Sequence, residues 1–259
     1  MKILSDSYFN EYKKRLATDV VQALARVDEI EMTAQNFTFY TSVAVISSSR
    51  IEGEQMEIDS YVKHKIQDIE YLPELVEKPN DLYRAYLFAK QNKLNPESFL
   101  QTHVTLAAHL LPEKWRGVYR KSEMLVLEHK TGRIQFEAAP FSIVEAEMKK
   151  LWNDIDDLMK RQLTVEEIFY YASFIHAVLV AIHPFNDGNG RAARLLEKWF
   201  LAEQLGEKAW YIKSEKYYYH HADDYYRNLN RMGMFYDKID YAKADLFLQM
   251  LPPSIAYKE

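Results

Sequence analysis

The sequence contains no cysteine and is poor in glycine and proline, with 7 and 8 of its 259 residues. Without cysteine the protein can form neither disulfide bonds nor thiolate metal sites. Such a composition is typical of a reducing compartment, so we expect a cytoplasmic protein. The scarcity of glycine and proline leaves little chain for turns and linkers and favours helices. Charged residues interrupt segment 1–16 too early for a signal peptide.

Long hydrophobic runs and an excess of positive charge are also missing. The longest apolar stretch, residues 174–182, has about half of the ~20 residues that a membrane-spanning helix needs, so we expect no membrane contact. The net charge is −5 and the lysines and arginines are scattered, which argues against a nucleic-acid partner. Apolar residues make up 48% of the chain, which is enough for a hydrophobic core. The composition therefore predicts an acidic, soluble globular protein of unspecified oligomeric state.

Apolar residues recur along most of the chain with the period of an α-helix. The pattern predicts helices at residues 8–32, 36–52, 59–71, 80–92, 96–110, 142–160, 165–182, 189–204, 215–231 and 240–250. Asn95 followed by Pro96 marks one helix start. Thr164 and Glu167 have the spacing of a capping box at a second helix start. Gly206 suits the end of a helix.

One segment, residues 124–140, departs from the helical period. Two short β-favouring runs there flank residues 130–133 and predict a β-hairpin. The predicted fold class is therefore mainly α, a helical core with a small hairpin. We divide the chain into an N-terminal helical region at 1–79, a core domain at 80–250 and a C-terminal tail at 251–259.

Two of the seven glycines lie in one loop, HPFNDGNGRAAR at residues 183–194, between two apolar helical segments. If a helix begins after Gly188, the backbone N–H groups of residues 188–191 lie at its N-terminus, where unpaired donors and the helix dipole attract anions. Arg191 and Arg194 share a face of that helix and add two guanidinium groups suited to phosphate oxygens. The segment therefore predicts a phosphate site.

The same loop carries a candidate base and a candidate metal ligand. Asp187 offers a hard oxygen to a Mg²⁺ ion that enters with a polyphosphate, and His183 is a candidate general base. Together these groups indicate phosphoryl or nucleotidyl transfer, and the absence of a Walker pattern argues against a P-loop enzyme. A single histidine beside an apolar helix is more often structural, as we expect for His176. A plain helix connection with solvated arginines is the alternative interpretation of the loop.

Segment 183–194 resembles the HPFx(D/E)GNGRxxR motif of Fic-domain proteins and matches it at every defined position. The segment WRGVYR at 115–120, the predicted hairpin and the segment DDYYRNL around Tyr225 occur in the order found in a Fic core. The resemblance therefore covers about residues 80–250. It implies an all-helical core with a β-hairpin flap and, for most proteins with this motif, transfer of AMP from ATP to a hydroxyl group of a protein.

The resemblance implies a role for each polar residue of the loop. His183 would deprotonate the attacking hydroxyl group, Asp187 would hold Mg²⁺ on the α- and β-phosphates, and Arg194 would hold the γ-phosphate. The other nucleotide-binding residues would be Asn186, Gly188, Asn189, Gly190 and Arg191. A related subgroup that transfers phosphate has lysine at the position of Gly190, so nucleotidyl transfer is favoured. A preference for ATP over UTP or CDP-choline rests on family frequency alone.

A second motif lies far upstream, in SSSRIEGEQ at residues 47–55, after an apolar helical run. Gly53 suits the left-handed residue that ends a helix, and Ser48 and Glu52 lie four apart on one face. Glu52 faces the negative end of the helix dipole, so we expect a cation nearby. The segment resembles the (S/T)xxxE(G/N) inhibitory motif of Fic proteins whose blocking helix precedes the core. This resemblance implies that Glu52 pairs with Arg194 and displaces the γ-phosphate.

Two further segments are open to more than one interpretation. A hairpin with a free edge could pair with an extended segment of a target along Ile134, Gln135 and Phe136, or it could merely cap the core. The tyrosine-rich segment 217–226 could contact an adenine ring or fill the core, and we favour the core for most of it.

The sequence therefore predicts an autoinhibited protein adenylyltransferase that uses ATP and Mg²⁺. It would act on Ser, Thr or Tyr hydroxyl groups of a target protein, or of itself. Two alternatives stay open: a hydrolase could use Glu52 to direct water at an AMP–protein linkage, and a non-catalytic module could change partners when ATP binds. The sequence identifies neither the target nor the signal that relieves inhibition.

Overall fold

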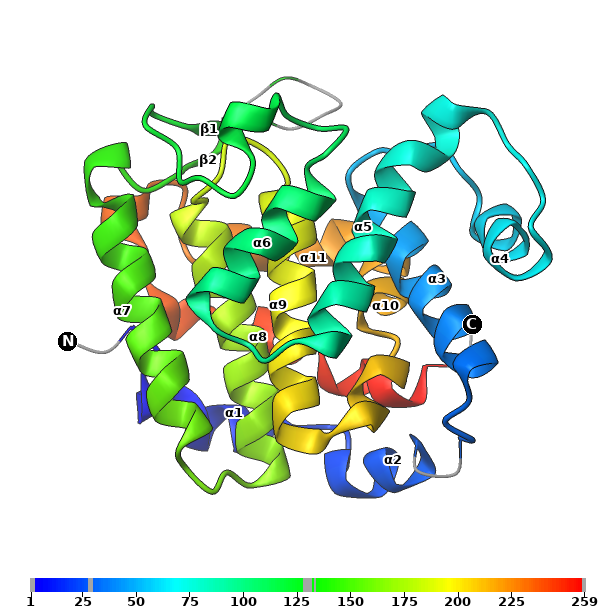
Figure 1. The fold of residues 1–259 in the computed structure, drawn as a ribbon. Coiled ribbons are helices and arrows are strands. Elements are labelled where there is room, and N and C mark those ends of the chain that lie inside the picture. Colours follow the sequence, from blue (N-terminus) through cyan, green and yellow to red (C-terminus); the bar gives the residue numbers. More distant parts are fainter. Residues whose placement is uncertain (1–2, 28–29, 128–131, 133, 258–259) are drawn as a thin grey trace.

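The computed structural model describes residues 3–27, 30–127, 132 and 134–257. Helices hold 68% of the residues and the strands form one small antiparallel sheet, which confirms the predicted mainly α fold (Figure 1). The described α-helices are α1 (Phe9–Arg15), α2 (Val20–Val27), α3 (Ala34–Ile51), α4 (Ile58–Gln67), α5 (Pro73–Gln91), α6 (Pro96–Leu106), α7 (Phe141–Met159), α8 (Val165–Ile182), α9 (Asn189–Leu205), α10 (Ser214–His220), α11 (Ala222–Asn230) and α12 (Asp245–Leu248). The described strands are β1 (Leu125–Leu127) and β2 (Ile134–Glu137).

Two consecutive helices, α8 and α9, lie at the centre of the molecule, with the other helices around them (Figure 1). α8 starts at the predicted capping box, in which Thr164 Oγ1 accepts the N–H of Glu167 and the Glu167 carboxylate accepts the N–H of Thr164. By length and composition this 18-residue helix could cross a membrane, but 78% of it is buried inside the protein, as in a core helix. The apolar stretch seen in the sequence, residues 174–182, is its C-terminal half.

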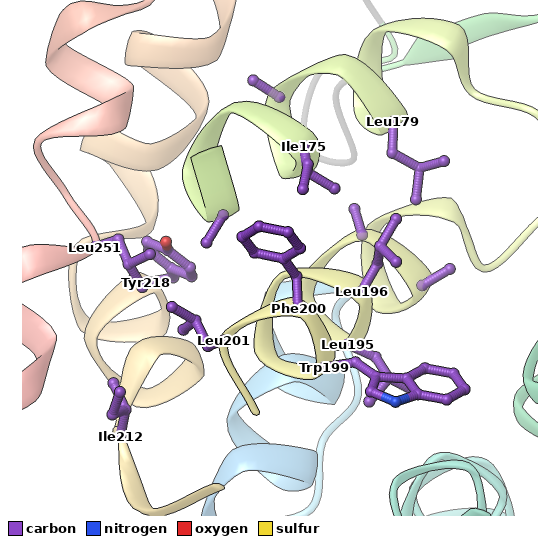
Figure 2. Close-up of a cluster of buried hydrophobic side chains, with 14 of the residues drawn as sticks. Ile175, Leu179, Leu195, Leu196, Trp199, Phe200, Leu201, Ile212, Tyr218 and Leu251 are labelled. Carbon is purple, nitrogen blue, oxygen red and sulfur yellow. The ribbon is translucent and has the colours of Figure 1, made fainter. Parts of the chain in front are cut away.

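Large apolar side chains fill the space between α8 and α9 (Figure 2). Ile175 and Leu179 of α8 face Leu196 and Phe200 of α9, and all four are fully buried. Burial of each such side chain stabilises the fold by about 1.5–3 kcal/mol. This interface therefore fixes both ends of the loop 183–188 that joins the two helices.

The hydrophobic core is continuous from Leu4 to Ile255. The boundary expected between residues 79 and 80 falls inside α5, which begins at Pro73 and continues through Pro79. Packing of the buried face of α5 on the core outweighs the hydrogen bond that an internal proline cannot make. The expected C-terminal tail is also packed, because Leu251 and Ile255 are buried.

Several predicted helices are shorter or divided in the structure, and three of them differ most. The helix expected at 8–32 is two helices, α1 and α2, because the side chain of Asp19 accepts a backbone N–H and starts a new helix. The helix expected at 215–231 is divided at His221 into α10 and α11. The region 240–250 contains the single turn of α12 beside a 3-10 turn. The period of the sequence is helical in each case, and a side-chain cap marks the new start at Asp19 but not at α10, α11 or α12.

The predicted hairpin is present as β1 and β2, which pair antiparallel with Val126 opposite Phe136. Of the turn expected at residues 130–133, only Gly132 lies inside the described residues, and it has a positive φ of 67°. The hairpin is anchored to the segment after α11, because the N–H of Glu137 donates to the carbonyl of Met234 at 2.8 Å. Figure 1 shows the hairpin above the start of α9.

Candidate active site

The loop between α8 and α9 is shaped by two left-handed residues. His183 ends α8 with φ 53°, and its N–H donates to Leu179 O at 2.9 Å. Gly188 precedes α9 with φ 80°. A Cβ atom on Gly188 would lie 2.9 Å from a methyl group of Leu106, so both the backbone and the packing require glycine there.

Asn189 closes the loop with its side chain. Its Oδ1 accepts the N–H of Phe185 and its Nδ2 donates to the carbonyl of Phe185, both at 2.8 Å. The side chain is buried and fully occupied by these bonds. These bonds turn the Asn189 side chain toward the loop backbone, and its backbone N–H, at the start of α9, is the group left for an anion. That Asn189 binds nucleotide stays a prediction.

His183 is held in one tautomer. Its Nδ1 lies 3.1 Å from the carbonyl of Val180. Because a carbonyl only accepts hydrogen bonds, Nδ1 carries the proton and Nε2 keeps a free lone pair. Burial is the largest influence on this residue and holds the pKa of His183 below its ordinary value of 6.5, although the nearby charge of Glu52 opposes the shift. His183 is thus a neutral base at neutral pH.

The structure brings the upstream motif to the loop and forms the predicted pair of Glu52 and Arg194. Arg194 Nη2 lies 2.5 Å from Glu52 Oε1, and Arg194 Nε donates to Ser48 Oγ at 2.8 Å. Arg194 Nη1 donates to the hydroxyl group of Tyr225 at 3.3 Å. Burial alone would raise the pKa of Glu52, but Arg194 and Arg191 outweigh burial and hold it below its ordinary value. The pair is therefore charged on both sides.

Because residue 190 is a glycine, there is room for the carboxylate of Glu52. A Cβ atom on Gly190 would lie 2.3 Å from Glu52 Oε1, which would force the carboxylate to move. A second glycine, Gly53, follows Glu52 and ends α3 with φ 89°, as predicted. The N–H of Glu54 bonds to the carbonyl of Ser49, which completes a left-handed helix end. Glu52 is thus fixed at the last turn of α3, directly against the start of α9.

A second ion pair at this position was not foreseen. Arg191 Nη2 lies 3.0 Å from Glu54 Oε1, and Lys78 Nζ lies 3.0 Å from the same oxygen. Arg191 is buried, with only 4% of its side chain exposed. Each arginine of the loop motif is therefore neutralised by one carboxylate from the end of α3, Arg194 by Glu52 and Arg191 by Glu54.

An open pocket of about 800 Å³ lies beside this cluster. Its polar end is formed by His183, Arg194 and Glu52, and its apolar walls come from the hairpin and from α11 and the segment after it. Phe136 and Gln135 line the hairpin wall, whereas Ile134 points outward with 49% exposure. A pocket with charge at one end and apolar walls suits a ligand with an anionic and a ring-like part.

Asn186 and Asp187 lie on the outer side of the loop. Asn186 is half-buried and Asp187 is exposed, and neither is among the residues that line the pocket. Asp187 Oδ1 accepts the N–H of Gly188 at 2.6 Å. A single exposed carboxylate beside a phosphate site fits Mg²⁺, which takes most of its ligands from water and phosphate.

Residues 93–201, which contain this loop and both of its helices up to residue 201, match the model of the Fic/DOC family. This part of the chain is a Fic domain. Over 111 residues the chain is 30% identical to the protein adenylyltransferase Fic of Nematostella vectensis. That alignment covers 42% of this chain and 23% of the relative, so the relative is much longer than the shared region.

Solved structures of Fic proteins share the fold at low sequence identity. A Fic family protein from Desulfovibrio desulfuricans superposes with a TM-score of 0.74 at 19% identity, covering 92% of this chain and 71% of that one. A Fic domain containing signaling protein from Bacteroides thetaiotaomicron gives 0.69 at 17% identity, covering 95% and 93%. Fic-1 from C. elegans gives 0.63 at 16% identity, covering 96% and 70%. The fold therefore extends beyond the Fic domain to nearly the whole chain.

Two residues that sequence analysis did not select support the loop of the Fic domain. Arg120 is buried, and its Nε donates to the carbonyl of His183 at 2.7 Å while its backbone N–H donates to the carbonyl of Pro184 at 2.9 Å. His103 stacks on Phe185 with ring centroids 3.6 Å apart. Arg120 lies in the quoted segment WRGVYR, but the sequence alone gives no sign of what its side chain contacts.

His103 bonds to the loop through both ring nitrogens. The N–H of Gly117 donates to Nδ1 at 2.9 Å, so Nε2 carries the proton and donates to the carbonyl of Asp187 at 3.0 Å. Burial lowers the pKa of His103 to about 4. A histidine that is neutral at neutral pH therefore links Asp187 to the segment before the hairpin.

Proposed function

We propose that the protein is an autoinhibited protein adenylyltransferase, which transfers AMP from ATP to a Ser, Thr or Tyr hydroxyl group of a protein. One observation carries the proposal: His183, with the proton on Nδ1, lines a pocket that Gly190, at the start of α9, and Arg194 also line. A base and an anion site that share one pocket suit the transfer of a phosphorus-containing group to a hydroxyl.

In the proposed reaction the oxygen of the target hydroxyl group attacks the α-phosphorus of ATP. The bond between the α-phosphorus and the bridging oxygen of the β-phosphate breaks, and pyrophosphate leaves. Nε2 of His183 takes the proton of the hydroxyl group. The N–H groups at the start of α9 and the guanidinium groups of Arg191 and Arg194 hold the phosphates.

Asp187 is the residue that would hold Mg²⁺, with Asn186 beside it at the rim of the loop. When bound, Mg²⁺ would neutralise charge on the α- and β-phosphates. His103 holds the carbonyl of Asp187, and so keeps the backbone of this residue in place while its carboxylate stays exposed.

The hairpin supports a role in holding the target. At the outer edge of β2, the N–H of Glu137 already donates to the carbonyl of Met234. Residues 134–136 of this edge are left to pair with an extended segment of a target. Such a segment would lie beside the pocket, because Gln135 and Phe136 line it. Its hydroxyl group would then approach His183 from the open side.

Autoinhibition is supported by the contacts of Glu52. Its carboxylate lies beside Gly190 and pairs with the guanidinium group of Arg194, which would otherwise bind the γ-phosphate. A charge-assisted bond to a largely buried arginine contributes about 1.5–3 kcal/mol, so most molecules would be in the blocked state.

The proposal is tested by incubating Glu52→Gly protein with ATP labelled on the α-phosphate. We expect self-labelling at least about tenfold faster than in the wild type, because a change of ~1.4 kcal/mol is tenfold in an equilibrium constant. The double variant Glu52→Gly with His183→Ala is the control and should bind ATP without transferring label. Labelling that persists in this double variant would contradict the role of His183, and equal rates in Glu52→Gly and wild type would contradict autoinhibition.

A second candidate function is removal of AMP from a modified protein. It is favoured by the charge of Glu52, which acts on His183 in the structure and could orient a water molecule toward a phosphodiester. Incubation of the self-labelled Glu52→Gly protein with unlabelled wild-type protein and Mg²⁺ distinguishes the two. Release of labelled AMP that requires Glu52 would favour the hydrolase over the transferase.

A further inference from the structure

A chain of fully buried polar groups lies behind Arg194, on the side away from Glu52. Tyr225 Oη, which accepts a hydrogen bond from Arg194, lies 2.9 Å from His176 Nε2. His176 Nδ1 lies 2.8 Å from Glu197 Oε2. The side chains of His176 and Glu197 are both 0% exposed, so neither reaches the pocket or solvent.

The direction of each hydrogen bond in this chain is fixed. Glu197 accepts, so His176 carries its proton on Nδ1 and presents a lone pair at Nε2. Burial raises the pKa of Tyr225 to about 12, so its hydroxyl group keeps its proton and donates to His176. The oxygen of Tyr225 therefore turns a lone pair toward Arg194, which has only donors to offer.

The carboxylate of Glu197 is only partly bonded: its Oε2 accepts from His176 and from Tyr218. A buried charge is costly unless its oxygens are bonded, and Oε1 of Glu197 has no hydrogen-bond partner among the described residues. Glu197 follows Arg194 by three residues on α9, so the two side chains share a face of the helix. The hydrogen bonds run from Glu197 on α9 to His176 on α8, then to Tyr225 on α11, and from there to Arg194. The position of the guanidinium group therefore depends on three helices.

We propose that His176 and Glu197 are positioning residues for Arg194, and that they act through the hydroxyl group of Tyr225. The inference rests on the proposed function, in which Arg194 holds the γ-phosphate. Ser48 and Glu52 hold the guanidinium group from the α3 side in the blocked state. When Glu52 leaves, the bond to Tyr225 keeps Nη1 in place. Nη2 still donates to the carbonyl of Ser48 at 3.2 Å, and its other N–H becomes available to the phosphate.

The test compares the affinities for ATP and AMP by calorimetry in the Glu52→Gly protein with Mg²⁺. Only ATP has a γ-phosphate, so loss of positioning at Arg194 should weaken ATP binding and leave AMP binding unchanged. Tyr225→Phe keeps the ring and removes the acceptor, and we expect its Kd for ATP to rise about tenfold. Tyr170→Phe is the matched control: Tyr170 is fully buried and donates to the carbonyl of Ser5 at 2.6 Å, outside the chain that leads to Arg194. It should keep the parent's ratio of affinities.

The role of His176 is tested in the same assay with two substitutions. His176→Gln can still accept from Tyr225 and donate to Glu197, and should retain most of the preference for ATP. His176→Leu should lose it, as Tyr225→Phe does. If His176→Leu does not fold, the comparison of His176→Gln and Tyr225→Phe with the parent still decides the matter.

Three results would overturn the inference. Equal weakening of ATP and AMP binding in Tyr225→Phe would mean that the hydroxyl group serves packing. Unchanged Kd values for both ligands in Tyr225→Phe would mean that Arg194 does not depend on it. A Glu52→Gly parent that binds ATP no tighter than AMP would overturn the assignment of Arg194 to the γ-phosphate, and the inference with it. A parent that prefers ATP separates the first two results from this failure of the proposed function.

Discussion

At the scale of single residues, the site depends on histidines whose protons are placed by their neighbours. His183 has a left-handed backbone, which is unfavourable for a residue with a side chain. The bond from its N–H to Leu179 and the bond from Arg120 to its carbonyl keep it there. In this backbone conformation the side chain of His183, at the end of α8, lines the pocket with a free Nε2.

The pH profile of transfer should report the pKa of His183. A protonated imidazole cannot accept the hydroxyl proton, so activity is lost as the pH falls through the pKa of the folded protein. Burial holds that pKa below 6.5, so the rate of Glu52→Gly protein should be flat near neutral pH and decline only below about 6.5. Initial labelling rates between pH 5 and 8 test this, and a midpoint above about 6.5 would contradict it.

His103 should make the stability of the protein depend on pH. The unfolded chain binds a proton at His103 below 6.5, whereas burial lowers the pKa of the folded protein to about 4. The free energy of unfolding should therefore fall by about 3 kcal/mol from this group as the pH drops from 6.5 to 4. His103→Phe keeps the stack on Phe185 but should be less stable at pH 7 and lose this part of the decline. Urea unfolding at several pH values gives both curves, and parallel curves would refute the assignment.

At the scale of elements, the end of α3 presents two carboxylates to the start of α9. Glu52 and Glu54 are separated by the left-handed Gly53, so the turn lets both reach an arginine of the Fic motif. Tyr226 also donates its hydroxyl proton to the carbonyl of Ile51 at 3.1 Å and holds this turn against α11. The end of α3 thus covers the predicted phosphate site.

Release of Glu52 alone should free only one of the two arginines. We expect Glu54→Gln, added to Glu52→Gly, to lower the Kd for ATP by a further threefold or so, because Arg191 gains a phosphate in place of a carboxylate that is already partly exposed. The matched control is Glu57→Gln, since Glu57 is exposed and pairs with Arg50, away from the motif. Calorimetry on the single and double variants measures the effect, and equal Kd values in Glu52→Gly and the double variant would argue against a second clamp.

The sequence was informative where one short segment carries both the residue and its constraint. Gly53, and Gly188 before α9, could be foreseen because a glycine next to a helical period has few other uses. Glu54 with Arg191 could not, because the two are 137 residues apart and nothing in either segment indicates the pairing. Asn189 shows a different limit: its position in the motif suggested a ligand contact, but the narrow turn bends its amide back onto the loop.

At the scale of the whole molecule, the N-terminal helices are part of the core that supports the Fic domain. The carboxylate of Asp154 on α7 accepts the N–H groups of Ile3 and Leu4 at 2.6 and 2.9 Å. Tyr12 of α1 is fully buried, with its ring 5.3 Å from that of Tyr170 on α8. The N-terminal helical region predicted at 1–79 thus packs on α8 and α9, the two helices that the loop 183–188 joins.

Truncation of Tyr12 should therefore destabilise the molecule as one unit. We expect Tyr12→Ala to lower the free energy of unfolding by about 3–5 kcal/mol, the usual cost of removing a buried aromatic side chain. Tyr12→Phe is the matched control and should be nearly neutral, because the hydroxyl group of Tyr12 is buried without a hydrogen-bond partner among the described residues. Urea unfolding followed by circular dichroism and by the fluorescence of the four tryptophans, which include the buried Trp152 and Trp199, should give one coincident transition for each protein. Two transitions in Tyr12→Ala, with the tryptophan signal at the wild-type midpoint, would mean that the N-terminal helices unfold on their own and that the Fic domain does not depend on them.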